Sequence, residues 1–267
     1  MIRDITIGQY YPTKSLLHRL DPRVKLVGTM VFIFSLFMFD GYLGYVIATL
    51  FLAGMIRLSK VPFRFMVKGL KAVMMLLLFT VIFNLFLTRQ GNELFSWYFI
   101  RIYDEGIILA VTMAFRLILL IIGSSLMTLT TTPNQLTDGM EKLLAPLNRI
   151  HVPVHEISMM MSIALRFIPI LLEETDKIMK AQQARGADFE NGSLIQKAKA
   201  LVPILVPLFV SAFRRANDLA MAMEARCYHG GAGRTKMKPL RYTKQDRMAY
   251  GILVLYLVVM IFSGKII

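Results

Sequence analysis

Two arginines close two long helical patterns in the same way, and their shared setting suggests a common chemical role. The chain reads KAQQARGADF around Arg185 and AMAMEARCYH around Arg226, so each arginine follows an alanine and precedes a small residue. A cation in the last turn interacts favourably with the helix dipole, which explains one arginine at a helix end. The helix dipole does not explain the repeated alanines. Small residues beside the arginine keep the helix end narrow, so that a partner's surface can approach its backbone closely. The pattern favours two protein-docking tips, with ordinary helix ends as the alternative.

Sequence patterns for catalysis, nucleotide binding or metal binding are not found along the chain. No G-x-x-x-x-G-K-[ST] is present, and the glycine-rich stretch 230–233 follows a helical pattern rather than a strand. The pair His151 and His155 is interrupted by Pro153 and lacks the H-E-x-x-H order of a zinc site. We therefore predict no catalytic residue, no metal site and no cofactor in this chain.

The composition indicates a membrane protein. Of the 267 residues, 56% are hydrophobic, whereas a soluble domain is usually about 45–50% apolar. Lys and Arg number 31 against 17 Asp and Glu, and we expect this excess to lie in cytoplasmic loops near anionic lipid, with no role in nucleic-acid binding. Cys227 is the single cysteine, which excludes an internal disulfide.

Five apolar stretches are predicted to cross the membrane, each close to the ~20 residues that span ~30 Å of hydrocarbon. Asp21 is predicted to cap the first one, with Pro22 at its first helical position. Arg116 interrupts the fourth, where we interpret it as lying in the cytoplasmic third and pairing with an acidic residue or helix carbonyls. The loop SWYFIRIY is β-rich and predicts a hairpin. The predicted spans are Val24–Phe39, Tyr42–Leu58, Gly69–Leu87, Gly106–Leu129 and Arg247–Phe262.

The segment 133–246 combines many charges with amphipathic helical patterns. Two parts of it, 157–172 and 201–212, are apolar enough to suggest further spans, but both are short and contain proline. If both crossed, Arg185 and Arg226 would lie on opposite sides of the membrane. Their matched surroundings favour one compartment, so we interpret both parts as amphipathic helices on, or partly in, the cytoplasmic face. The helices predicted here are Asn134–Leu147, Pro153–Arg185 and Ser193–Arg226.

The distribution of positive residues predicts the orientation. Positive clusters lie at the N-terminus, at 57–71 and across 133–247, whereas the loops 40–42 and 89–104 contain few. With the N-terminus inside, four spans place the segment 133–246 in the cytoplasm. The predicted fold is all-α: a polytopic membrane protein with about five transmembrane helices and a cytoplasmic domain of long amphipathic helices. The predicted domains are 1–132 with four transmembrane helices, 133–246 with three cytoplasmic helices, and 247–267 with the last transmembrane helix.

Three stretches carry a specific resemblance to a known family: SLLHRLDPRVKL, ALRFIPILLEETDKIMKAQQARGADF and PLFVSAFRRANDLAMAMEARCY. The sequence resembles the transmembrane T component of energy-coupling factor (ECF) transporters, ABC-type importers of vitamins and trace metals, over essentially the whole chain. The resemblance implies a non-catalytic coupling subunit in a bacterial or archaeal cell membrane, with its N-terminus and coupling domain in the cytoplasm. It would transmit ATP-driven conformational change from two ATPase subunits, which bind the ATP, to a substrate-binding S component for vitamin or metal uptake.

The resemblance also implies roles for particular residues. The residues that would dock into the two ATPases are Ala184, Arg185, Gly186, Ala225, Arg226 and Cys227. Cys227 departs from the family's usual glycine, which puts the geometry of that turn in question. The apolar faces of the same helices would hold the S component, since methionine repacks against different partners, although core filling explains these methionines equally well. They are Met159, Met160, Met161, Met179, Met221 and Met223.

Two other classes of protein are alternatives. A free-standing secondary transporter or channel would carry paired ionisable residues deep in several spans, and Arg116 alone fits that description. A membrane-bound enzyme would need the catalytic motifs that the sequence lacks. In the ECF family the S component selects the substrate, so the imported vitamin or metal is specified by another chain.

Overall fold

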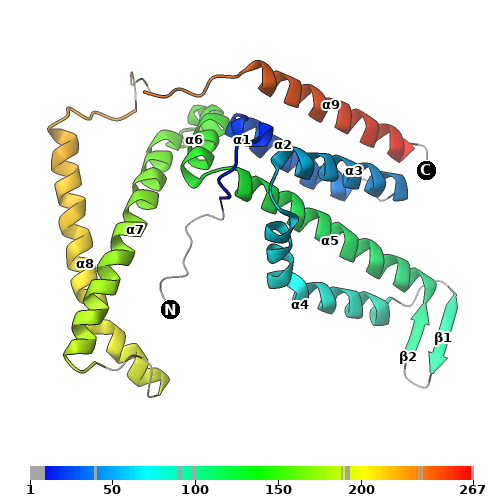
Figure 1. Cartoon of the computed structure of the whole chain (residues 1–267), viewed down its shortest axis with the longest axis horizontal. Helices are drawn as coiled ribbons and strands as arrows, with labels where there is room; N and C mark the ends of the chain where they lie inside the picture. Colours follow the sequence, from blue (N-terminus) through cyan, green and yellow to red (C-terminus); the bar gives the residue numbers. More distant parts are fainter. Residues whose placement is uncertain are drawn as a thin grey trace. The chain divides into compact units, whose positions relative to one another are not determined.

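The computed structural model describes residues 10–38, 41–88, 92–97, 100–187, 189, 193–231, 233, 235 and 237–265. The described chain is almost entirely helical (Figure 1), which confirms the predicted all-α, polytopic class. Two compact units are present: a membrane unit formed by Gly8–Met140 with Leu240–Ile267, and a long-helix unit formed by Glu141–Pro239. The predicted division at 132 and 246, with a cytoplasmic middle part, stays a prediction.

The membrane unit packs its long helices around one apolar core. Helix α2 contacts α3, α5 and α9, and α3 also contacts α5 and α9. The core between these helices includes Phe32, Leu36, Ala48, Leu119 and Met260. The elements of this unit are α1 (Leu16–Arg19), α2 (Pro22–Met38), α3 (Tyr42–Ser59), α4 (Phe63–Leu87), β1 (Glu93–Trp97), β2 (Ile100–Tyr103), α5 (Asp104–Thr130), most of α6 (Pro133–Leu144) and α9 (Lys244–Lys265).

Local capping fixes where several helices begin. The Asp21 carboxylate accepts the N–H of Arg23 at 2.9 Å in the first turn of α2, as the sequence predicted. At the start of α9, the Asp246 carboxylate accepts the Thr243 N–H at 2.7 Å while the Thr243 hydroxyl accepts the Asp246 N–H. This reciprocal pair is a capping box, and it starts α9 three residues before the predicted Arg247.

The predicted hairpin is present between α4 and α5. Strands β1 and β2 pair antiparallel, with Ser96 opposite Arg101 and Trp97 opposite Ile100. The two residues that connect the strands, 98 and 99, lie outside the described residues.

The long-helix unit contains the end of α6, the 3-10 helix η2 (Ala145–Ile150), α7 (Val154–Ala184) and α8 (Leu194–Glu224). Both α7 and α8 are assigned as continuous helices of 31 residues although Pro169, Pro203 and Pro207 lie inside them. In Figure 1, α7 and α8 cross and then diverge toward the start of α7 and the end of α8. The three α-helices predicted for this part of the sequence are therefore α6, α7 and α8.

Among the described residues, five helices are long and apolar enough to cross a membrane, which agrees with the predicted number, but not all of them are the predicted segments. By length and composition they are α3, α5, α7, the Lys199–Glu224 part of α8, and α9, with α4 as a sixth if its two segments form one bent span. Helix α2 has 17 residues, about 26 Å, which is slightly short for the hydrocarbon core. Helices α7 and α8 qualify because each has 31 residues, whereas the sequence interpretation judged only their apolar parts, 157–172 and 201–212, and found them too short to span.

Candidate docking site at two helix tips

Helix α7 ends in a Schellman turn centred on Arg185. The Gly186 N–H donates to the Gln183 carbonyl at 3.0 Å, and the Ala187 N–H donates to the Gln182 carbonyl at 3.0 Å. Gly186 has a φ of +87°, the left-handed conformation that reverses the chain at such an end. Arg185 is thus the last residue before the reversal, and its side chain is exposed.

Helix α8 ends in the same turn, with Cys227 in the place of the glycine. The Cys227 N–H donates to the Glu224 carbonyl at 2.8 Å, and the Tyr228 N–H donates to the Met223 carbonyl at 3.1 Å. Cys227 has a φ of +54°, in the left-handed region that favours glycine. The missing glycine therefore leaves the turn intact and places about 1–2 kcal/mol of backbone strain at this tip.

Both tips are open to a partner. The side chains of Arg185 and Arg226 are exposed, as are Ala184, Gly186, Ala225 and Cys227 around them. Within the described residues, neither guanidinium takes part in a hydrogen bond or an ion pair. Each tip therefore offers an unshielded planar cation with five N–H donors, a shape suited to carboxylates and carbonyl groups.

The packing of α7 on α8 places the two tips at opposite ends of the helix pair. Near the middle of α7, Glu174 accepts hydrogen bonds from Ser211 and from Arg215, whose Nη2 lies 3.0 Å from Oε2. Farther along α7, the Gln182 amide donates to the Pro203 carbonyl at 3.4 Å. Residues later in α7 therefore contact residues earlier in α8, so the two helices run antiparallel. Along a straight helix, Arg226 would lie roughly 35 Å from Pro203, the residue that contacts the end of α7.

The candidate methionines lie on both helices, away from a buried core. Met160, Met161 and Met221 are exposed, with 58%, 40% and 65% of their surface accessible, and the other three are partly exposed. Exposed apolar side chains also line α8, including Phe209 and Phe213. Only 11% of the apolar window of α7 and 6% of that of α8 are buried within the chain, so these faces need lipid or a partner to cover them.

Arg116 lies mid-way along α5 and is buried against α3. Its Nε and Nη2 donate to the Tyr45 hydroxyl at 3.0 and 2.6 Å, and its guanidinium lies over the Phe37 ring at 5.6 Å. Tyr45 is in the first turn of α3, the end that the predicted topology places outside. Within the predicted topology, this contact and the position of Arg116 near the middle of α5 place it outside the predicted cytoplasmic third, while the topology itself stays a prediction.

His155 binds a carboxylate of its own unit. Its Nδ1 lies 3.1 Å from Oε1 of Glu141, whose other oxygen accepts a hydrogen bond from Ser158 at 3.1 Å. The backbone of Gly231 covers the imidazole so closely that an added Cβ would lie 2.2 Å from Cδ2 of His155. His151 is exposed at the end of η2 and forms the turn into α7.

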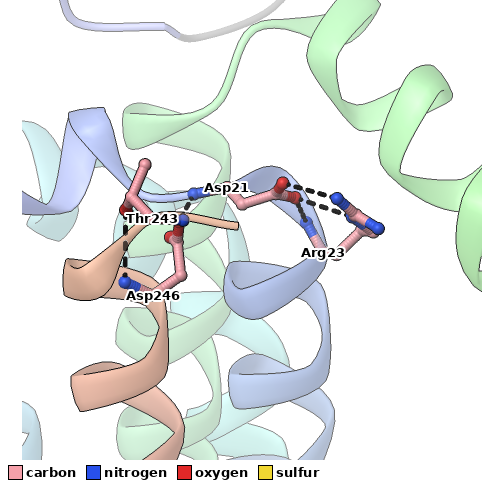
Figure 2. Close-up of polar contacts among 4 residues, drawn as sticks. All are labelled: Asp21, Arg23, Thr243 and Asp246. Atoms are coloured by element: carbon pink, nitrogen blue, oxygen red, sulfur yellow. Dashed lines mark hydrogen bonds and ion pairs between the residues drawn. The ribbon is translucent and has the colours of Figure 1, made fainter. Parts of the chain in front are cut away.

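A second polar cluster, which the sequence interpretation missed, connects the starts of α2 and α9 (Figure 2). The buried Asp246 carboxylate accepts the Asp21 N–H at 2.8 Å in addition to the Thr243 N–H. The Asp21 carboxylate binds the Arg23 guanidinium through two bonds of 2.9 and 3.0 Å. The Arg23 guanidinium also lies 4.0 Å from the centre of the Tyr242 ring. The T-x-x-D spacing of Thr243 and Asp246 predicts the local cap, but nothing local indicates the bond to Asp21.

The adjoining α1 segment is held by a neutral histidine. Burial lowers the pKa of His18 below its usual value, against a smaller opposing effect of its hydrogen bond to a backbone carbonyl. The geometry fits a neutral ring in which Nε2 donates to the Tyr11 carbonyl at 3.0 Å and Nδ1 accepts from the Ser15 hydroxyl at 2.7 Å. His18 thus has a structural role at the start of the membrane unit.

These features define a class of protein: a polytopic helical membrane protein with two exposed helix ends, each of which carries an arginine. The family model for CbiQ, described as cobalt transport protein, matches residues 13–238. The chain is 58% identical to the energy-coupling factor transporter transmembrane protein EcfT of Clostridium kluyveri, over 93% of both chains. It is 55% identical to the EcfT protein of Ruminiclostridium cellulolyticum over 96% of both chains, and 49% identical to that of Bacillus subtilis over 92% of this chain and 93% of the relative. The chain belongs to the CbiQ/EcfT family of transmembrane components of energy-coupling factor transporters.

Proposed function

We propose that this chain is the non-catalytic coupling subunit of an ECF-type importer and that its two arginine tips each dock into one ATPase subunit. The observation that carries the proposal is the identical Schellman turn at Arg185 and Arg226, each with an exposed guanidinium and small neighbours. Two identical tips are the expected feature of a subunit that engages two similar partners, because each tip then needs the same complementary surface. The family assignment, to a transporter's membrane component, fits a role without catalysis.

The antiparallel packing of α7 and α8 supports two separate docking events. Tips at opposite ends of the pair are far enough apart to engage two protein subunits at once. The Glu174–Arg215 ion pair joins the helices between the tips, so movement at one tip is transmitted to the other helix. ATP-driven approach of the two ATPases would then shift α7 and α8 against each other.

The orientation of α7 and α8 follows from the same requirement. An antiparallel pair that crossed the bilayer would place Arg185 and Arg226 in different compartments, and only one of them would meet a cytoplasmic ATPase. A pair that lies along the cytoplasmic face keeps both tips in the cytoplasm, together with the N-terminus. Charged side chains along both helices, such as Arg166 on α7 and Arg214 on α8, favour this orientation because a charge in hydrocarbon is costly.

The apolar faces of the same helices would bind the substrate-binding S component. The exposed methionines and the Phe209–Phe213 part of α8 offer flexible and aromatic contact area, the composition of protein interfaces that accept more than one partner. The S component brings the vitamin or metal, and this chain would convert the movement of its tips into a tilt of that partner.

The docking proposal is tested by reversing both charges. The double variant Arg185→Glu, Arg226→Glu is expected to abolish ATPase co-purification and uptake of labelled vitamins, whereas each single variant retains one contact and a weakened complex. The matched control is Arg166→Glu, Arg214→Glu, which reverses one exposed arginine in the body of each helix. Normal assembly and uptake in the double tip variant would refute the proposal.

The S-component proposal needs a separate test. Phe209→Ser with Phe213→Ser is expected to release the S component from the purified complex while both ATPases remain bound. Phe79→Ser with Phe83→Ser removes another exposed aromatic pair, from α4, and serves as the control. Retention of the S component by the α8 variant would show that another face binds it.

A further inference from the structure

An apolar cavity of about 230 Å³ lies inside the membrane unit, between α1, α2, α3, α5 and α9. Its walls are almost entirely hydrocarbon, with Leu17, Val24 and Phe32 buried behind it. An apolar cavity of about 150 Å³ already holds a benzene-sized guest. The space is therefore sufficient for a segment of a hydrocarbon chain, and its lining gives water few hydrogen-bond partners.

The cavity opens to the surface of the helix bundle. Four of its lining residues are well exposed and mark the opening: Leu16 on α1, Leu58 on α3, and Met248 and Ile252 on α9. These exposed leucine, isoleucine and methionine side chains form an apolar opening, which lipid tails cover more favourably than water does. A hydrocarbon chain therefore has a path into the cavity from the bilayer.

A buried ammonium group forms the polar end of the cavity. Lys25 is only 9% exposed, lines the cavity, and donates to the Thr130 carbonyl at 2.9 Å and to the His18 carbonyl at 3.4 Å. Among the described residues, no carboxylate forms an ion pair with it, because Asp21 binds Arg23 and Asp246 binds N–H groups. A lysine ammonium has three donors, so one remains for a ligand oxygen.

Exposed Lys and Arg residues are sequence neighbours of residues that line the cavity. Arg19 lies between the lining residues Leu17 and Leu20, and Arg57 directly precedes Leu58. Lys244 directly precedes the lining residue Gln245 and lies one helical turn before Met248, on the same face of α9. Three cations near an apolar opening attract an amphiphile with a negative head.

We propose that this cavity is a binding site for one anionic glycerophospholipid, with an acyl chain inside it and the phosphate among Lys25, Arg19 and Lys244. Bound there, the lipid contacts α1, α2, α3, α5 and α9 together and so stabilises the membrane unit at the Lys25 end. The inference does not depend on the docking role of the arginine tips, because none of its residues belongs to α7 or α8.

The site is tested by filling the cavity. The full-length chain, purified in mild detergent, is exchanged into mixtures of phosphatidylglycerol and phosphatidylcholine with identical acyl chains, and retained lipid is counted by native mass spectrometry. Wild type is expected to retain one phosphatidylglycerol. Ala249→Phe is expected to lower its occupancy at least about tenfold, because the ring displaces several methylene groups of the chain, and Ala249→Leu less so. Val254→Phe adds the same ring on the exposed face of α9 and should leave occupancy unchanged.

The headgroup is tested by removing charge. Arg19→Gln with Lys244→Gln is expected to reduce the preference for phosphatidylglycerol over phosphatidylcholine to near equality, whereas Arg149→Gln with Lys238→Gln should keep it. Equal retention of both lipids by wild type would overturn the anionic preference. Unchanged occupancy in both Ala249 variants, or a cavity that retains detergent but no phospholipid, would overturn the site itself.

Discussion

Arg185 and Arg226 occupy the same position in the same hydrogen-bonded turn, yet they lie at opposite ends of an antiparallel helix pair. The local geometry is identical because each residue precedes one in the left-handed conformation, Gly186 or Cys227. The separation results from helix packing alone. This combination of identical tips and distinct locations supports the proposed docking to two similar partners.

The side of the membrane on which each tip lies is the first prediction. Cys227 is the single cysteine and is exposed beside Arg226, so a membrane-impermeant maleimide reports the location of that tip directly. A second variant, Cys227→Ser with Ala184→Cys, reports the other tip. Both are expected to react in inverted vesicles and to be protected in intact cells. Labelling of the two tips from opposite sides would instead identify α7 and α8 as a spanning pair.

The second prediction concerns the strained turn at Cys227. Cys227→Gly removes the left-handed strain but increases the entropy of the unfolded chain, so we expect stability to change by less than about 1 kcal/mol. ATPase binding should be retained. Cys227→Val places a β-branched residue at the same φ and is expected to lower stability by more than about 1 kcal/mol and to weaken ATPase binding.

Thermal unfolding in detergent and ATPase co-purification measure these effects. Gly186→Val is the equivalent change at the other tip, and it should cause a larger loss, because glycine adopts its positive φ without the strain that Cys227 already carries. If Val is tolerated at both positions, the Schellman turn does not determine how the arginines are presented.

The third prediction concerns the polar connection between α2 and α9. Asp246→Ala leaves the Asp21 N–H and the Thr243 N–H without their acceptor, and each bond to a charged group contributes about 1.5–3 kcal/mol. We expect a loss of about 3 kcal/mol or more in unfolding free energy and faster hydrogen exchange at the start of α2. Asp246→Asn keeps one acceptor oxygen and should lose less. Asp218→Ala, an exposed acid on α8, is the control, and an equal effect there would contradict this role for Asp246.

The fourth prediction concerns Gly231 and His155. Any Cβ at position 231 would clash with the imidazole ring, so Gly231→Ala is expected to displace the segment after α8 and to lower the unfolding temperature. His155→Ala removes both the ring and its contact with Glu141. In the double variant the clash is absent, so Gly231→Ala should then have almost no additional effect. A full additive loss in the double variant would show that the two residues do not interact.

Many structural features of this protein could be predicted from short stretches of its sequence. The cap at Asp21, the β-rich loop, the three helices of the segment 133–246 and the repeated Ala-Arg ends could all be recognised, because each depends on residues within one or two turns of one another. The membrane class and the CbiQ/EcfT family were likewise predictable from composition and from the stretches around both arginines. The start of α9 could also have been predicted, since Thr243 and Asp246 have capping-box spacing.

The tertiary structure decided the features that join distant parts of the chain. Glu174 meets Ser211 and Arg215, and Asp246 meets Asp21, through contacts that no local pattern contains. Helical periodicity states which face of a helix is apolar, but it does not state which helix covers that face or in which direction that helix runs. For that reason the sequence alone identified the two arginine tips, and only the packing of α7 on α8 placed them at opposite ends.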